Sequence, residues 1–369
     1  MAEPLKNAFN PELVRGIGRE LRGAWPAFPE RKFVAEATSG LEALELTPRA
    51  WHVADVLQAH LPKDFGRAAQ VVVASLGPVL DDTEGNGMTP FRYLPHVFWV
   101  ARYGLGHFEA AMTAQHALTQ RFTAEFSIRA YLEAHPELTL DRLQRWASDP
   151  SVHVRRLVSE GTRPLLPWAA RLQAFRKDPG PVLELLELLK DDPERYVQRS
   201  VANNLNDISR DHPDRVVELC RRWKKGAGPG RSYIVGHALR TLVKRGHSGA
   251  LSVIGFADQA KVRVDAARFS PKVVPIGETL RFNFDVHSTS QKPQSLLVDF
   301  RVHFVKAKGQ TSPKVFKLQA LELPARASAT LQGRISFRVH TTRQPYPGQH
   351  QLEALINGQP YPLGQFRVK

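Results

Sequence analysis

The sequence Asp149-Pro-Ser-Val-His-Val-Arg-Arg-Leu-Val158 returns 43 residues further on as Asp192-Pro-Glu-Arg-Tyr-Val-Gln-Arg-Ser-Val201. A period of about 40–47 residues is typical of HEAT-like repeats, in which pairs of helices stack into a solenoid. On both sides of this repeat, up to about residue 255, helical patterns follow one another and are separated by Pro and Gly. We therefore expect residues 1–257 to form a HEAT-like helical-repeat domain.

The pattern changes after residue 255, where apolar and polar side chains alternate. Phe282 and Phe284, for example, share one face of a segment whose intervening residues are polar, as in a half-buried strand. Other segments alternate in the same way, and Asn357-Gly358 is a typical hairpin turn before the last strand. About seven short strands in residues 258–369 favour an immunoglobulin-like β-sandwich. The expected fold is thus multidomain, α then β: a HEAT-like α-helical solenoid followed by an immunoglobulin-like β-sandwich.

Positive charge is unevenly distributed along the chain. The 369 residues hold 51 Lys and Arg against 36 Asp and Glu, a formal net charge of +15, and residues 258–369 alone hold 17 basic and 7 acidic side chains. Such a basic domain suits a polyanion partner, most often a nucleic acid whose phosphates pair with Lys and Arg. Composition alone leaves a second explanation open, in which the excess charge serves only solubility.

The single cysteine, Cys220, excludes internal disulfides, cysteine-type zinc fingers and iron–sulfur clusters, and it fits a reducing compartment. The opening MAEPLKNAFN has neither the basic nor the apolar segment of a secretion signal, and no stretch is as long and apolar as a membrane span. We expect a cytoplasmic protein, associated with the nucleoid through DNA, with no membrane partner. The GxxxxGKS/T, GxGxxG, HExxH and GxSxG motifs are absent, so we expect no cofactor and no metal.

A polar stripe runs along a helix in each copy of the repeat. On a helical wheel, apolar side chains of residues 151–163 fall on one side and polar side chains fall on the other. The polar side chains are Arg155, Arg156, Ser159, Glu160 and Arg163 in the first copy, and Arg199, Asn203, Asn206, Asp207 and Arg210 in the second. One hypothesis is a solvated face on which Arg156 and Glu160 pair at i,i+4. The other is a functional face.

The functional hypothesis assigns the arginines to phosphates and the carboxylates to a sugar. The arginine fork donates two parallel hydrogen bonds to a phosphate. Carboxylates suit the cleavage of an N-glycosidic bond, because the departing sugar resembles an oxocarbenium ion, and they can also orient the attacking water. An alkylated base that is already cationic leaves without a general acid. Acids and arginines would therefore suffice, without a histidine or a lysine nucleophile.

Three runs of the sequence resemble a known family. They are Phe126-Ser-Ile-Arg129, Val154-Arg-Arg-Leu-Val-Ser-Glu-Gly-Thr-Arg-Pro164 with Leu166-Pro-Trp168, and Val201-Ala-Asn-Asn-Leu-Asn-Asp-Ile-Ser209. They are similar to the bacterial DNA alkylation repair glycosylases of the AlkC type, in the superfamily of HEAT-like repeat DNA glycosylases. The resemblance covers essentially the whole helical region. It implies a solenoid, to which a subset of the family adds a C-terminal immunoglobulin-like domain.

The resemblance implies hydrolysis of the N-glycosidic bond of cationic bases, 3-methyladenine and 3-methylcytosine, in duplex DNA, without full flipping of the lesion. Because no lysine is proposed to form a Schiff base, we expect a monofunctional DNA-3-methyladenine-type glycosylase that leaves an abasic site and an intact strand. The expected partner is double-stranded DNA containing alkylated bases, and the chain is expected to be a monomer. The alternative is a non-catalytic HEAT-repeat DNA-binding scaffold.

By the same resemblance, the acids expected around the lesion are Glu125, Glu160 and Asp207. For Glu125, which rests on the match of the run TAEFSIR at residues 123–129, a charge that compensates a helix N-terminus is an alternative explanation. The residues expected to contact DNA are Trp168, near the lesion, and Arg155, Arg156, Arg163 and Arg199. One or two of these arginines could instead hold the carboxylates in place.

Overall fold

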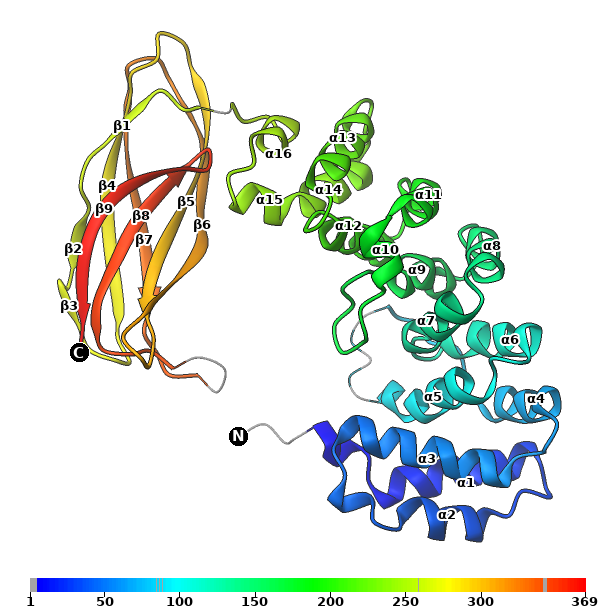
Figure 1. Cartoon of the computed structure of the whole chain (residues 1–369). Coiled ribbons are helices and arrows are strands. Elements are labelled where there is room, and N and C mark those ends of the chain that lie inside the picture. The colour runs from blue at the N-terminus through cyan, green and yellow to red at the C-terminus, as the bar shows by residue number, and fades with distance from the viewer. Residues whose placement is uncertain (1–4, 84, 86, 88, 258, 341–343) are drawn as a thin grey trace. The chain divides into compact units, whose positions relative to one another are not determined.

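The structure is a computed structural model, and it describes residues 5–83, 85, 87, 89–257, 259–340 and 344–369. Helices extend to Val253 and strands follow them, as the change in periodicity predicts (Figure 1). The described helices are α1 (Pro11–Ala24), α2 (Glu30–Thr38), α3 (Leu46–His60), α4 (Phe65–Ser75), α5 (Leu94–Tyr103), α6 (Phe108–Thr119), α7 (Glu125–Ala134), α8 (Pro136–Trp146), α9 (Val152–Gly161), α10 (Gln173–Lys177), α11 (Gly180–Leu189), α12 (Arg195–Ile208), α13 (Pro213–Lys224), α14 (Pro229–Ala238), α15 (Arg240–Lys244) and α16 (Ser248–Val253), with short 3-10 helices η1 (Leu5–Ala8), η2 (Leu41–Ala43) and η3 (Thr89–Tyr93).

The chain divides into two compact units. The first comprises residues 1–211 and 227–237, and the second comprises residues 212–226 and 238–369, so that α13, α15 and α16 belong with the strands. The boundary predicted between residues 257 and 258 follows the change from helix to strand instead, and it stays a prediction, since residue 258 lies outside the described residues. None of the described helices is long and apolar enough to cross a membrane.

In the first unit, successive helices pack against one another in a row, as in a HEAT-like solenoid (Figure 1). Both copies of the repeat begin with the same turn. The Asp149 carboxylate accepts a hydrogen bond from the Ser151 backbone N–H at 2.8 Å. The Asp192 carboxylate likewise accepts one from the Glu194 backbone N–H at 2.9 Å. An Asp side chain that bonds its own backbone two residues on favours a turn, so the Asp-Pro dipeptide starts α9 and α12 in the same way.

Helix α9 approaches α7 closely at Gly161. A Cβ atom at this position would lie 2.5 Å from Cγ2 of Ile128, closer than real side chains come. Ile128 is fully buried and β-branched, so its side chain has little room in which to move. Gly161 therefore sets the distance between the two helices that carry Glu125 and Glu160.

The second unit contains two sheets. The described strands are β1 (Val262–Val264), β2 (Arg268–Ser270), β3 (Val273–Val274), β4 (Thr279–Ser288), β5 (Gln294–Val305), β6 (Thr311–Leu323), β7 (Ser328–Ser336), β8 (Gly348–Ile356) and β9 (Gln359–Val368). In the first sheet, β1 and β2 pair with successive parts of one edge of β4, and β7 pairs with its other edge. The second sheet has the order β3-β9-β8-β5-β6 and is antiparallel except between β3 and β9.

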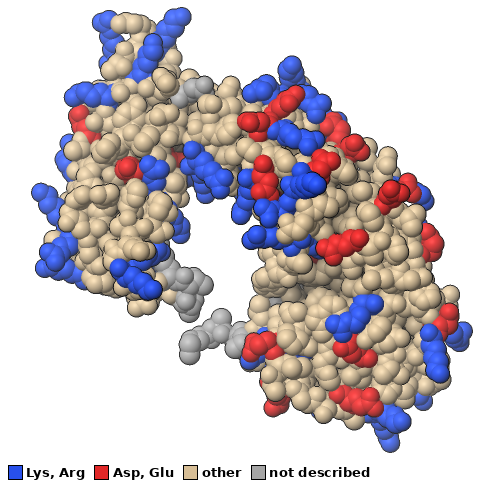
Figure 2. Space-filling view, viewed as in Figure 1, with Lys and Arg blue, Asp and Glu red and all other residues tan. Residues whose placement is uncertain are grey.

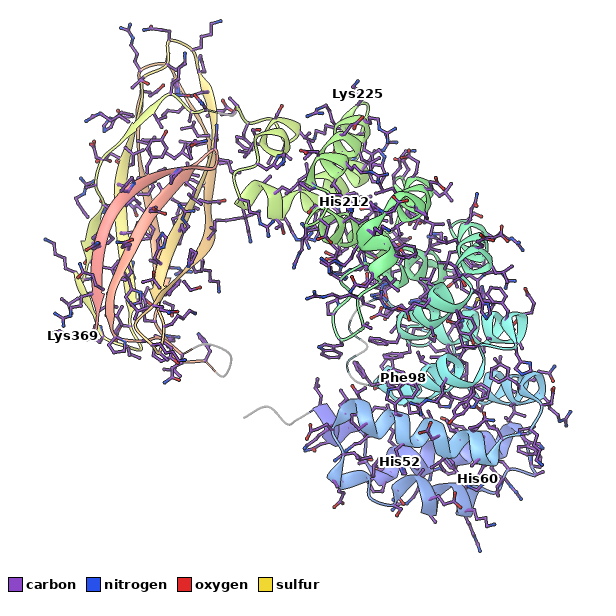
Figure 3. All side chains as sticks on the ribbon, in the orientation of Figure 1. His52, His60, Phe98, His212, Lys225 and Lys369 are labelled. Atoms are coloured by element: carbon purple, nitrogen blue, oxygen red, sulfur yellow. The ribbon has the colours of Figure 1, made fainter. Side chains whose placement is uncertain are left out.

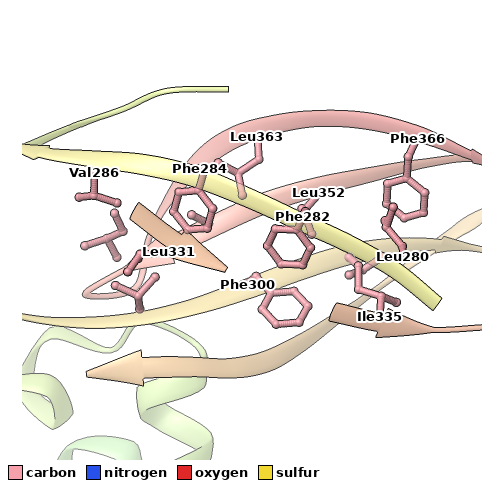
Figure 4. Close-up of a cluster of buried hydrophobic side chains, with 14 of the residues drawn as sticks. Leu280, Phe282, Phe284, Val286, Phe300, Leu331, Ile335, Leu352, Leu363 and Phe366 are labelled. Carbon is pink, nitrogen blue, oxygen red and sulfur yellow. The ribbon is translucent and has the colours of Figure 1, made fainter. Parts of the chain in front are cut away.

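An apolar core lies between the two sheets (Figure 4). Phe282 and Phe284 of β4 are both buried in it, as their spacing predicts, and the Phe282 ring centroid lies 5.1 Å from that of Phe300 on β5. Asn357 and Gly358 form the two-residue turn between β8 and β9, with φ of 47° and 80°. Positive φ at both positions is characteristic of a type I′ hairpin, and the predicted turn is confirmed.

Gly161→Ala is expected to lower the free energy of unfolding by about 1–3 kcal/mol, because the added methyl group overpacks the contact with Ile128. Gly23→Ala on α1 is the matched control, since nothing lies within 4 Å of the Cβ atom that it adds. The control should leave stability unchanged or raise it by up to about 1 kcal/mol. Denaturant unfolding of the full chain measures both changes, and equal stability of the two variants would contradict the close approach of α9 to α7.

Candidate active site

Five side chains of alternating charge form a continuous row that joins α7, α9 and α12. In order, this acid–arginine row is Glu125, Arg156, Glu160, Arg163 and Asp207. Arg156 Nη1 donates to Glu125 Oε2 at 2.8 Å, and its Nη2 lies 3.4 Å from Glu160 Oε1. Arg163 Nη1 donates to Glu160 Oε1 at 2.7 Å, and its Nε donates to Asp207 Oδ2 at 2.9 Å. The structure thus brings together the three acids that the resemblance implies.

The acid–arginine row is buried. Its side chains are between 6% and 18% exposed, with Asp207 at 6% and Glu160 at 8%. The solvated-face hypothesis is therefore wrong for these two acids, although the i,i+4 pair of Arg156 and Glu160 does form. Buried charges require partners of opposite sign, which explains the alternation. Because the row contains three acids and two arginines, it holds one more negative than positive group.

The three acids differ in how completely they are hydrogen-bonded. Both oxygens of Glu160 are engaged, because Ser200 donates to Oε2 at 2.6 Å while the arginines bind Oε1. Asp207 and Glu125 each accept bonds on one oxygen, Oδ2 and Oε2 respectively. Among the described residues, no side chain donates to Asp207 Oδ1 or Glu125 Oε1. These two oxygens are therefore available to a substrate or to a water molecule.

The surroundings of Glu160 and Asp207 shift the pKa values of these two acids in opposite directions. Burial alone would raise the pKa of Glu160, but the charges of Arg156 and Arg163 and the bonds from Ser200 and Arg163 outweigh it, so its pKa is lowered. Burial also raises the pKa of Asp207, and there the single partner Arg163 does not compensate, so the pKa stays above its ordinary value. Glu160 is thus held as a carboxylate, and Asp207 is the acid more readily protonated.

A network of polar side chains holds Glu160 in place between α9 and α12. Ser159 donates to Ser200 at 2.7 Å, and Asn204 Nδ2 donates to the Ser159 carbonyl at 2.8 Å and to Thr162 Oγ1 at 3.0 Å. Each of these side chains is buried. Buried hydrogen bonds restrict the side chains that they join, so Glu160 has little freedom to rotate.

Trp168 lies in the loop after α9 and has an unusual conformation. Its φ is 66°, in the left-handed region, and the residue is 73% exposed. Arg129 of α7 anchors this loop through hydrogen bonds to backbone carbonyls. Its Nη1 donates to the carbonyls of Gly161 and Arg163 at 3.2 and 2.7 Å, and its Nη2 donates to the carbonyl of Ala170. Burial lowers the pKa of Arg129 to about 10, which leaves it charged at neutral pH. The loop therefore presents an aromatic side chain to solvent from a fixed base.

The arginines expected at phosphates are placed in three ways. Arg156 and Arg163 form ion pairs with carboxylates. This is the alternative role that the sequence analysis left open for one or two of the arginines. Arg155 pairs with Asp192, the first residue of the second repeat, with Nε 2.6 Å from Oδ2. Arg199 lies exposed on α12. Contact of any of these arginines with DNA stays a prediction.

The structure adds three residues that the sequence did not single out: Arg129, Ser200 and Asn204. Arg129 and Asn204 do lie in the runs that carry the resemblance, so a signal was present, but nothing in the spacing shows that Arg129 reaches carbonyl groups after α9. Among the described residues, no group of three or more His, Cys, Asp or Glu side chains is arranged to hold a metal ion.

Comparison with known proteins places this site in a family. A family model described as "DNA alkylation repair enzyme" matches residues 113–225, which include the whole acid–arginine row. A second model, described as "Uncharacterised protein YhaZ, C-terminal Ig-like domain", matches residues 263–369 and confirms the immunoglobulin-like fold. The Bacillus subtilis (strain 168) protein "Uncharacterized protein YhaZ" is 35% identical over 361 residues, 96% of each chain.

A solved structure is also similar over the whole chain. It is that of the Pseudomonas fluorescens alkylpurine DNA glycosylase AlkC, bound to DNA containing an abasic site analog, with a TM-score of 0.91, 36% identity and 100% of both chains covered. Similarity at this level over full length confirms the resemblance of the sequence runs, and the chain belongs to the AlkC family of DNA alkylation repair enzymes.

Proposed function

We propose that this protein is a monofunctional DNA glycosylase that hydrolyses the N-glycosidic bond of cationic alkylated bases, 3-methyladenine and 3-methylcytosine, in duplex DNA. Membership of the AlkC family supports a DNA glycosylase that acts on alkylated bases. The observation that carries the finer proposal is the acid–arginine row, which brings three buried acids together. Buried, preorganised negative charge stabilises a developing cation far better than water does.

The reaction follows from the different environments of the acids. The bond between the sugar C1′ and the base nitrogen breaks, and its electron pair stays on the base and neutralises the positive charge there. The sugar becomes an oxocarbenium-like cation, which the ionised Glu160 stabilises. Water adds to C1′ and gives its proton to Asp207, whose Oδ1 accepts no bond from the described residues and whose pKa is raised. The product is an abasic site.

Two features support the absence of strand cleavage and of full base flipping. The row contains only Glu, Asp and Arg, so it offers no amine for a Schiff base with the sugar. The acids act on the sugar and on the attacking water. Contact with these two groups does not require the base to rotate out of the DNA helix. Trp168, exposed at the end of its anchored loop, is the aromatic side chain that we place against the DNA.

Lowered base release is expected for Glu160→Gln and Asp207→Asn, by about 100-fold or more, since each substitution removes a negative charge or a proton acceptor from the transition state. Release of 3-methyladenine and 3-methylcytosine from methylated duplex DNA measures it. Asp211→Asn is the matched control, an acid paired with Arg176 at the surface, and its release should stay within about twofold of the unmodified protein.

Affinity for unmodified DNA should change little in both active-site variants, and thermal unfolding verifies that each of them is folded. A non-catalytic HEAT-repeat scaffold would show no release above background by the unmodified protein, and that result would overturn the proposed function.

The rate is also expected to fall with decreasing pH. Asp207 accepts a proton only when ionised, and its pKa is raised above the ordinary 3.8, so activity is lost at a higher pH than for an ordinary aspartate. Glu160, with a lowered pKa, stays ionised over this range. Single-turnover rates from about pH 4 to pH 8, corrected for base loss from DNA alone, measure the profile. If the rate of Asp207→Asn still falls toward low pH in the same way, Asp207 is not the group whose protonation causes the fall.

The sandwich is proposed to bind DNA through its positive charge. Figure 2 shows more Lys and Arg than Asp and Glu on the visible face of this domain. Arg281 and Arg334 are exposed and face each other across β4 and β7, and Lys314 and Lys317 are exposed on β6. Like charges directly opposite each other destabilise a sheet, so an anion between the two arginines would relieve their repulsion.

Replacing Arg281, Arg334, Lys314 and Lys317 by Gln in the full chain should weaken DNA binding and flatten its salt dependence, by about 0.9 in the logarithmic slope for each phosphate that the protein no longer neutralises. Binding to unmodified duplex DNA over a range of salt concentrations measures the slope. An unchanged slope would show that the basic charge of the sandwich serves solubility alone.

A further inference from the structure

An apolar pocket of about 480 Å³ opens in the first unit between α3, α5, α7 and the loop that carries Trp168. Phe98 of α5, labelled in Figure 3, stacks on Trp51 of α3 with ring centroids 4.3 Å apart, and Phe126 of α7 meets Phe98 edge to face at 6.2 Å. The Arg102 guanidinium lies 4.0 Å from the centre of the Trp51 ring. These contacts make a rigid aromatic wall.

The pocket adjoins the acid–arginine row through two connections. Phe126 directly follows Glu125, so the helix that presents the acid also presents the aromatic wall. Arg129, one turn further along α7, also lines the pocket and bonds the carbonyls of the loop after α9. Trp168 and Ala170 of that loop line the pocket as well. The pocket and the acid–arginine row are therefore built on the same helix and beside the same loop.

The chemistry of the lining favours a neutral, planar and aromatic ligand. The pocket walls are mostly apolar, and the lining carboxylate, Glu133, is exposed, so a cation would find little buried negative charge there. Stacking of nucleobases on aromatic side chains is favourable and tolerates different bases. Hydrolysis at the row turns a cationic base into a neutral heterocycle, because the electron pair of the broken bond stays on the base.

We infer that this pocket binds the excised methylated base after cleavage, as a product site separate from the acids. The inference rests on the proposed function. The aromatic walls take up the free base by stacking, and the exposed Trp168 is one of the aromatic side chains that line the pocket. The pocket does not hold the cationic lesion during bond cleavage, because two arginines, Arg102 and Arg129, line it and its carboxylate Glu133 is exposed.

Binding of free 3-methyladenine to the full chain without DNA tests the pocket directly, by saturation-transfer NMR and by calorimetric titration. Ala101→Phe and Ala130→Phe each place a phenyl ring in the pocket from a lining position, and Ala35→Phe, at an exposed position of α2, is the matched control. Saturable binding to the unmodified protein and to the control, weakened about tenfold or more in either filled variant, is expected. Thermal unfolding verifies that the filled variants are folded.

No saturable binding to the unmodified protein, or equal affinity in a folded filled variant, overturns the inference. Single-turnover base release separates the product site from a site for the flipped lesion: the filled variants should keep the rate within about twofold. A rate loss as large as that of Asp207→Asn would mean that the base enters the pocket before cleavage, and it also overturns the inference. If the protein releases bases from DNA but does not bind free 3-methyladenine, only the product site is contradicted. If it binds free 3-methyladenine but releases no base from DNA, the proposed function is contradicted.

Discussion

The need to neutralise buried charge between α7, α9 and α12 is the constraint on which the helical unit depends. An unpaired buried ion costs several kcal/mol, so each arginine of the acid–arginine row lies between two carboxylates. Arg156 of α9 pairs with Glu125 of α7, and Arg163, just after α9, pairs with Asp207 of α12. These two ion pairs fix the three helices relative to one another. The close approach at Gly161 belongs to the same arrangement, because the ion pairs require α7 and α9 to lie close together.

The acids of the row differ in how completely their charge is neutralised. Glu160 has both oxygens bonded and a lowered pKa, so it is held as a fixed negative charge, whereas Asp207 has one hydrogen-bond partner and a raised pKa. Trp168 combines left-handed backbone with an exposure of 73%, and both features cost free energy in the folded protein. Such costs concentrate at functional sites, and here they lie beside the same helices that carry the acids.

The second unit is organised around its own core, and its boundary illustrates a limit of sequence patterns. Asn357 of the hairpin turn donates from Nδ2 to the Ala257 carbonyl at 3.0 Å, and Gly246 lies so close to Gly358 that an added Cβ would be 2.9 Å from its carbonyl oxygen. The turn after α15 is therefore packed against the β8–β9 turn, and the last helices join the strands. Periodicity marks where helix changes to strand, but it carries no information on which elements pack together.

The sequence by itself determined the order of helices and strands, the repeat and the hairpin at Asn357-Gly358, because local periodicity and turn chemistry are written along the chain. Its family runs also named Glu125, Glu160 and Asp207 as the candidate acids. Only the tertiary structure decided that the polar stripe is buried, and that Arg156 and Arg163 bind carboxylates while Arg129 supports the Trp168 loop. The reason is physical: an ion pair between residues more than 30 positions apart depends on distance and burial in space, and a helical wheel contains neither.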